Sequence, residues 1–347
     1  MNIDLLKRLC ETPAVSGRES RVRDLILGEV DDLFDDVEVD PLGSLICWRR
    51  ATRDGASDAR TVMVLCHMDE IGFYVSHVSD DGFVHVDPAG IFDPRHLFGR
   101  RVLVCAQAGD FPGAMNAKGR PIHIASRKEL QKVPKITDFV VDTGLGARAK
   151  EFIKIGDYVV VDERFVDLGD RIMSKALDNR VACWIGIEAI RKIVADQTKH
   201  AYNICVAFTA QEEVGLRGAA ATAFRVAPDV AIGIDVTLAC DTPGIPDEES
   251  ILKLGDGFGL LLKDDTFIPD VGLVEQVEGL ARELGLKCQR HVLRRGGQDG
   301  AAAQQARGGA KAVGIMVGTR YIHTATEMID KDDLAGARDI VTAFLTS

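Results

Sequence analysis

The pattern of apolar and polar positions divides the chain into three stretches. In the first, residues 1–70, a helical spacing of apolar residues from Val22 to Val30 is followed by short strand-like runs. The last run, TVMVLCH at 61–67, is almost continuously apolar, which is typical of a central strand covered on both faces. We also expect Ser16 and Glu19 to form a capping box ahead of the helix.

The second stretch, residues 71–165, is rich in short β-like segments separated by Gly, Asp and Pro. Its pattern predicts strands within 72–79, 82–88, 100–106, 120–126, 137–144 and 156–163. Short strands at such spacing, with turn residues between them, are typical of a small β-barrel or sandwich. No long helix is expected in this stretch.

The third stretch returns to alternating helices and strands. Its periodicity predicts helices at 179–195, 218–224, 271–285, 301–309 and 331–345, and strands at 201–210, 230–237 and 312–318. The simplest interpretation is one α/β catalytic domain made of residues 1–70 and 166–347. A β-rich domain of residues 71–165 is inserted into it.

Composition narrows the classes of partner. The net charge of −11 disfavours nucleic acid and anionic membranes, because both demand a basic face. No segment approaches the ~20 apolar residues of a membrane span, and the first residues lack a signal-peptide pattern. The eight cysteines include no C-x-x-C pair. We therefore expect a cytoplasmic protein with neither a nucleic-acid nor a membrane partner.

Metal-capable side chains gather in five short segments, each at the end of an apolar strand or the start of a helix. These segments carry His67, Asp178, Glu212 with Glu213, Asp235 and His323. Strand ends of α/β sheets form ligand clefts, so the five segments can converge in one crevice. Imidazole together with carboxylate suits Zn²⁺, Co²⁺ or Mn²⁺ better than Ca²⁺, which prefers oxygen ligands alone.

Each segment also has a structural explanation when it is taken alone. His67 could be a hydrogen-bonded structural histidine, and Asp178 could cap a helix. The pair Glu212–Glu213 could form a solvated acidic turn. Asp235 is harder to explain in this way, because an isolated carboxylate in an apolar strand is costly to bury. The joint occurrence of the segments favours a metal site, and the H-E-x-x-H, G-x-x-x-x-G-K-[ST], G-x-G-x-x-G and G-x-S-x-G motifs are absent.

The order and spacing of these segments resemble those of a known family. The matching motifs are HMDEIGF, SKALDNR, QEEVGLRGA, GIDVTLACDTPG, KLGDG, RRGGQDG and TRYIHTATEMI. They are similar to motifs of the tetrahedral-aminopeptidase and glutamyl-aminopeptidase family of dinuclear metallopeptidases, some members of which carry the name cellulase M. The resemblance spans nearly the whole chain, with Gln298 standing where the family commonly has Thr. It implies a mixed-sheet α/β metallopeptidase domain with an inserted β-barrel-like domain.

Carried over position by position, the resemblance gives each candidate a role. It implies that His67 and Asp235 are ligands of one divalent ion, while Glu213 and His323 are ligands of a second. Asp178 would bridge the two ions.

The resemblance also implies two catalytic residues and an assembly. Glu212 would be the general base, and Asp69 would fix the His67 imidazole. The expected cofactors are two divalent ions per subunit, Zn²⁺ or Co²⁺. The expected partners are peptide substrates and further copies of the chain in a large homo-oligomer, with a dodecamer as the expected form.

Two other functions remain as alternatives. A glycosidase is suggested by the cellulase name, but it needs two carboxyl groups about 5–10 Å apart across one bond. Adjacent Glu212 and Glu213 do not readily provide this geometry, and the histidines would have no role. The second alternative is a binding or assembly protein that has lost catalysis. The presence of every expected ligand and base position disfavours it.

Overall fold

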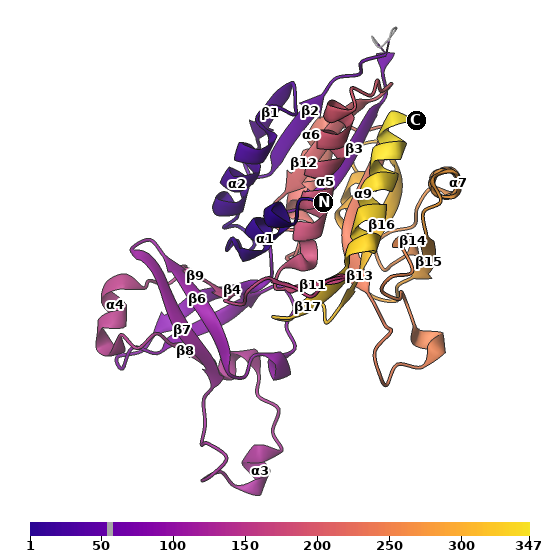
Figure 1. Cartoon of the computed structure of the whole chain (residues 1–347). Helices are drawn as coiled ribbons and strands as arrows, with labels where there is room; N and C mark the ends of the chain where they lie inside the picture. Colours follow the sequence, from indigo (N-terminus) through magenta and orange to yellow (C-terminus); the bar gives the residue numbers. More distant parts are fainter. Residues whose placement is uncertain (54–57) are drawn as a thin grey trace.

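The computed structural model describes residues 1–53 and 58–347, in which an α/β sandwich carries a closed β-barrel at one end (Figure 1). Within these residues, eleven strands form one sheet. Nine of them lie in the order β1 (Asp36–Val39), β2 (Leu45–Arg49), β12 (Asn203–Thr209), β3 (Thr61–His67), β13 (Val230–Leu238), β16 (Lys311–Arg320), β17 (Glu327–Asp330), β11 (Arg171–Ser174) and β10 (Val166–Asp167). Strand β14 (Phe258–Lys263) pairs with β16 and with β15 (Cys288–Val292).

The sheet is mixed, as expected. Strands β12, β3, β13 and β16 run parallel to one another, whereas β2, β14 and β17 join this group antiparallel. Parallel pairing brings the carboxyl ends of the central strands to one edge of the sheet. The segments that follow β3, β12 and β13 therefore start close together.

Helices cover both faces of the sheet. One face packs against α1 (Ile3–Glu11), α2 (Ser20–Val30), α5 (Leu177–Ala195), α7 (Val271–Leu284) and α9 (Lys331–Thr346). The other face packs against α6 (Arg217–Val226) and α8 (Asp299–Gln304). Strand β3 alternates between the two cores: Val62 and Val64 face the first set of helices, and Met63 and Leu65 face the second. The prediction of a central strand covered on both faces is confirmed.

The inserted β-rich stretch closes into a barrel with a core of its own. Its strands follow the order β4 (Gly72–Val78), β5 (Val84–Ala89), β8 (Phe139–Asp142), β7 (Gly109–Ala117), β6 (Arg100–Ala106) and β9 (Tyr158–Val161). Apolar side chains such as Phe73, Val102 and Phe139 fill its interior. Figure 1 shows the barrel projecting from the end of the α/β sandwich.

Short helical segments complete the described residues. They are η2 (Pro94–His96), α3 (Arg127–Leu130), η3 (Ile136–Asp138), η4 (Gly146–Arg148), α4 (Ala149–Phe152) and η5 (Asp247–Glu249). No helix in the part of the chain that the structure describes is long and apolar enough to cross a membrane.

Two local predictions are wrong. Residues 120–126 form a turn that leads into α3, because the N–H groups of Ile124 and Ala125 donate to the Pro121 carbonyl instead of a neighbouring strand. Ser16 and Glu19 do not form a capping box: α2 begins at Ser20, and the Glu19 side chain makes no cap hydrogen bond. The Ser16 hydroxyl donates to Asp69 instead, and the Glu19 carboxylate accepts the backbone N–H of Gln211.

Candidate metal centre

The candidate ligands lie at one edge of the sheet because of where the strands end. His67 is the last residue of β3, and its register partner Thr209 ends the parallel strand β12. Glu212 and Glu213 follow β12 after a short turn, and Asp235 lies within β13. Two more candidates approach from outside this group: Asp178 at the start of α5 and His323 in the turn after β16.

Asp178 connects two clusters of possible ligands. Its Oδ1 atom lies 3.3 Å from Nε2 of His67, and the same nitrogen lies 3.8 Å from Oδ1 of Asp235. Its Oδ2 atom lies 3.2 Å from Nε2 of His323, which is 3.4 Å from Oε1 of Glu213. Each cluster offers three ligand atoms within 4.8 Å of one another. One carboxylate thus presents one oxygen to each imidazole.

Glu212 lies close to the same atoms. Its Oε2 is 3.9 Å from Nε2 of His67, and His67, Glu212 and Glu213 form a third group with ligand atoms within 4.8 Å. Both adjacent glutamates therefore reach the cluster.

The cluster concentrates negative charge where water is largely excluded. Its four carboxylate side chains, those of Asp178, Glu212, Glu213 and Asp235, are each no more than 11% exposed. Burial raises the pKa of Glu212, Glu213 and Asp235, and neighbouring carboxylates add to the effect.

The same carboxylates change the pKa of the two imidazoles, those of His67 and His323. Burial lowers the pKa of His323, but contacts with Asp178 and Glu213 outweigh this effect and raise the pKa to about 12. Burial likewise lowers the pKa of His67, but the carboxylates around it, Glu212 first, raise it well above its ordinary value. Divalent cations would relieve this excess of negative charge. The mixture of nitrogen and oxygen donors fits ions of the Zn²⁺ and Co²⁺ class.

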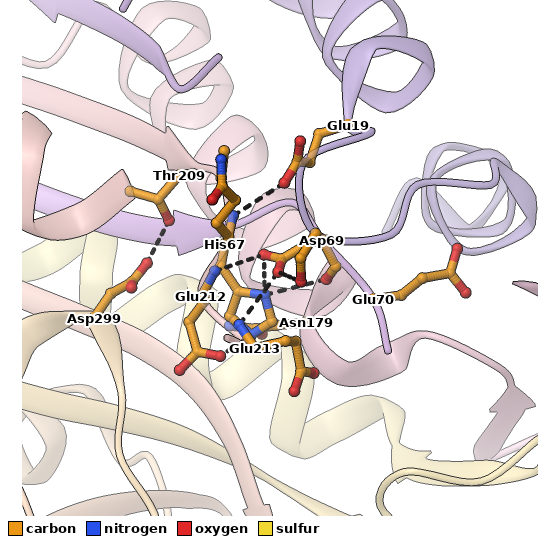
Figure 2. Close-up of polar contacts among 12 residues, drawn as sticks. Glu19, His67, Asp69, Glu70, Asn179, Thr209, Glu212, Glu213 and Asp299 are labelled. Atoms are coloured by element: carbon orange, nitrogen blue, oxygen red, sulfur yellow. Dashed lines mark hydrogen bonds and ion pairs between the residues drawn. The ribbon is translucent and has the colours of Figure 1, made fainter. Parts of the chain in front are cut away.

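Asp69 organises the site by accepting hydrogen bonds from several directions (Figure 2). Its Oδ1 accepts the Glu212 N–H at 3.0 Å and lies 3.4 Å from Nδ1 of His67. Its Oδ2 accepts the Glu213 N–H at 3.2 Å and the Ser16 hydroxyl at 2.6 Å. Asp69 therefore holds the turn that carries both glutamates. It also lies against the imidazole, whose Nδ1 is 3.2 Å from the Asp69 carbonyl oxygen.

Glu19 holds the same turn and was missed as a site residue. Its Oε1 accepts the Gln211 N–H at 3.0 Å and the Gly17 N–H at 2.6 Å. Burial, reinforced by the charge of Asp69, raises the pKa of Glu19 to about 7. With Asp69 it binds three successive N–H groups, those of residues 211–213. The S-x-x-E spacing matched a helix cap, so the sequence pattern concealed this long-range contact.

Asp299 and Gln298 lie outside the three possible ligand groups. Asp299 accepts a hydrogen bond from the Thr209 hydroxyl, and both residues are buried (Figure 2). Gln298 is the N-cap of α8, and its Oε1 accepts the Gly300 N–H at 2.6 Å. Gln298 therefore caps this helix through its oxygen, while its buried Nε2 has no hydrogen-bond partner among the described residues.

A cavity of about 590 Å³ opens onto the cluster. Its floor includes His67, Asp178, both glutamates, Asp235 and His323. Its walls include Leu238, Leu293, Arg295 and Ile322, and the segment that follows β5 contributes Ile91. A small organic substrate can therefore reach every residue of the predicted cluster from one side.

A mixed α/β sheet with carboxylates and imidazoles converging beneath a cavity at its carboxyl edge is the arrangement of a metallohydrolase. Comparison with known proteins gives the family. The chain belongs to the M42 glutamyl aminopeptidase family, whose model matches residues 43–340. This membership supports aminopeptidase activity, a form of peptide hydrolysis, and implies the use of a divalent metal.

Individual relatives agree with this assignment over their full length. The glutamyl aminopeptidase of Lactococcus lactis is 31% identical, over 99% of this chain and 96% of its own. The crystal structure of a TET aminopeptidase from a marine sediment Thaumarchaeota archaeon has a TM-score of 0.94 at 32% identity, covering 99% of this chain and 95% of that one. The TET1 peptidase of Pyrococcus horikoshii, which can assemble into a tetrahedron or a large octahedral shell, has a TM-score of 0.87 at 30% identity, covering 99% of both chains. The expected fold class is confirmed.

We predict that Asp69→Asn weakens binding of Co²⁺ or Zn²⁺ by about 10–100-fold, the usual effect of losing a partner that orients a ligand. An amide has a single acceptor oxygen and cannot serve both N–H groups and the imidazole. Calorimetric titration of the metal-free protein measures the effect.

Asp333→Asn is the matched control, because buried Asp333 also accepts two backbone N–H groups, those of Gly255 and Gly257, one on each oxygen. An equal loss of metal affinity in the two variants would show that Asp69 has no special role in the site.

Proposed function

We propose that the protein is a dinuclear metal-dependent aminopeptidase that removes N-terminal residues from peptides. The observation that carries this proposal is the position of Asp178, whose two oxygens face two separate imidazoles at 3.3 and 3.2 Å. His67 and Asp235 would complete one ion site. Glu213 and His323 would complete the other. Zn²⁺ and Co²⁺ are the ions that this donor set suits best.

The chain's own residues would divide the chemistry. Bound divalent ions would supply charge that polarises the scissile carbonyl and acidifies a water molecule. Glu212 lines the cavity and would take the proton of the attacking water, then deliver it to the leaving amine. Asp69 would hold Glu212 in place by accepting a hydrogen bond from the backbone N–H of Glu212. The free amine of the substrate would bind beside the carboxylates of the cavity floor.

We predict that Glu212→Gln and Glu213→Gln have different defects. If Glu212 is the base, Glu212→Gln keeps both ions and loses about 10²–10⁴-fold in rate, the usual effect of losing a general base. Glu213→Gln should lose one ion and recover part of its activity at high metal concentration. Elemental analysis combined with peptidase assays measures both quantities.

The reverse pattern of metal loss would exchange the two roles. Losses in rate below about tenfold in both variants would mean that the active site lies elsewhere.

The cavity walls favour an acidic N-terminal residue. Arg295 is the one Lys or Arg side chain among the described residues that line the cavity. Two divalent ions would balance the four carboxylates of the floor, which leaves the guanidinium as the uncompensated charge. A carboxylate side chain on the substrate would pair with it.

We predict that anilide substrates with N-terminal Glu are cleaved with higher kcat/KM than those with Leu or Lys. Arg295→Met should lower the Glu-to-Leu ratio about 10–100-fold, because hydrogen bonds to charged groups contribute about 1.5–3 kcal/mol.

The neighbouring Arg294→Met is the control, because Arg294 is also exposed but does not line the cavity. An unchanged ratio in the Arg295 variant, or an equal change in the control, would contradict the assignment.

The two alternatives are less well supported. A glycosidase needs separated carboxyl groups across a bond, whereas the carboxylates here share imidazoles in groups whose ligand atoms lie within 4.8 Å. In a protein without catalysis, nothing would explain why several carboxylates are buried together at a cost in free energy. Cleavage of aminoacyl anilides that chelation abolishes distinguishes the aminopeptidase from both.

We also propose that the barrel, within the inserted domain at 71–165, builds a large homo-oligomer, with a dodecamer as the expected form. Exposed apolar side chains on this domain, including Ile122, Ile124 and Ile155, support the proposal. The assembly described for the relative from Pyrococcus horikoshii also supports it. A cytoplasmic location stays a prediction.

We predict that replacing residues 71–165 by a short linker gives smaller particles in sedimentation velocity. The α/β domain has a separate core, so the variant should still fold by circular dichroism. A soluble variant that sediments as an assembly with the native number of subunits would contradict the proposed role.

A further inference from the structure

Glu327 is a buried carboxylate outside the predicted ligand set. It begins β17 and is only 2% exposed. Its Oε2 accepts the backbone N–H of Asp178 at 3.0 Å, and its Oε1 accepts the backbone N–H of His323 at 2.8 Å. A single side chain therefore holds the main chain of two candidate ligands.

These two ligands reach the site from distant parts of the chain. Asp178 is the second residue of α5, whereas His323 lies in the turn between β16 and β17. His323 has a φ of 62°, a left-handed conformation that non-glycine residues seldom adopt. The hydrogen bond to Glu327 holds the backbone in this conformation and so directs the imidazole towards Asp178.

The position of Glu327 is itself fixed. In the antiparallel pair of β11 and β17, Glu327 lies opposite Ser174, four residues before Asp178 in the chain. The same pairing brings the two segments that carry Asp178 and His323 together. Because the Glu327 carboxylate accepts a hydrogen bond from each segment, it keeps the main chains of Asp178 and His323 close together.

We propose that Glu327 is the positioning residue of the second ion site, the site of Asp178, Glu213 and His323. Both of its oxygens are needed, because each accepts a different backbone N–H. A glutamine of the same shape offers one acceptor and turns an NH₂ group towards the other N–H. One donor would be left buried without a partner, which displaces the segment that carries it. This inference rests on the proposed two-ion function.

The test is metal binding by Glu327→Gln in the full chain. Metal-free protein is titrated with Co²⁺ alone, followed by calorimetry and by the visible absorption of the ion. The native protein should bind two ions. Glu327→Gln should bind the second ion about 10–100-fold more weakly. The ion of His67 and Asp235 should lose less affinity, because Asp178 is the one proposed ligand of that ion whose backbone Glu327 holds.

Two further variants separate positioning from general damage. Asp333→Asn is the matched control, because buried Asp333 also uses both oxygens to accept two backbone N–H groups, those of Gly255 and Gly257 at 2.8 and 2.7 Å. It should retain both ions. Glu327→Asp keeps two acceptor oxygens and should bind the second ion with an affinity between those of Glu327→Gln and the native protein.

Native affinity for both ions in Glu327→Gln would overturn the inference. So would an equal loss of the second ion in Asp333→Asn. If the native protein itself binds fewer than two ions, the two-ion function fails and this inference fails with it. The native titration distinguishes that outcome from a failure of Glu327 alone.

Discussion

Four carboxylates are buried side by side at the carboxyl edge of the sheet, and the electrostatic cost of this arrangement constrains the rest of the site. Asp178, Glu212, Glu213 and Asp235 share a space with two imidazoles, and the pKa of three of these carboxyls is raised by burial and by their neighbours. Such a group is stable only if cations compensate it or protons neutralise it. The positions of all six side chains suit compensation by divalent ions.

A set of buried carboxylates around the cluster bonds to the backbone instead of to the proposed ions. Asp69 and Glu19 together accept the N–H groups of residues 211–213, and Glu327 accepts those of Asp178 and His323. Backbone groups in turns lack the partners that a helix or sheet would provide. The fold therefore supplies acceptors where the site needs rigid turns. The five candidate ligands lie in or next to five different helices and strands, so their positions depend on these turns.

The sequence was sufficient to predict the features that depend on local pattern. The apolar run ending at His67 predicted the central strand, and carboxylates and imidazoles at strand ends predicted the cluster that the structure brings together. The resemblance supplied the distinction between bridging and terminal ligands. Contacts between distant segments could not be predicted in this way. Glu19 has the spacing of a helix cap, and nothing local to Glu327 indicates that it bonds to Asp178.

The strand expected at 120–126 failed for a related reason. Its alternation of apolar and polar residues resembles a half-buried strand, but no strand within residues 1–53 and 58–347 pairs with it, and Ile122 and Ile124 remain exposed. A local sequence pattern shows that a segment can form a strand. Whether the strand forms depends on a neighbouring strand that can pair with it.

Anomalous diffraction from crystals soaked in Zn²⁺, recorded on both sides of the zinc absorption edge, tests the central claim most directly. The account predicts two anomalous peaks per chain. One should lie between His67 and Asp235, the other between Glu213 and His323, and each should contact one oxygen of Asp178. A single peak, or peaks that Asp178 does not contact, would contradict it.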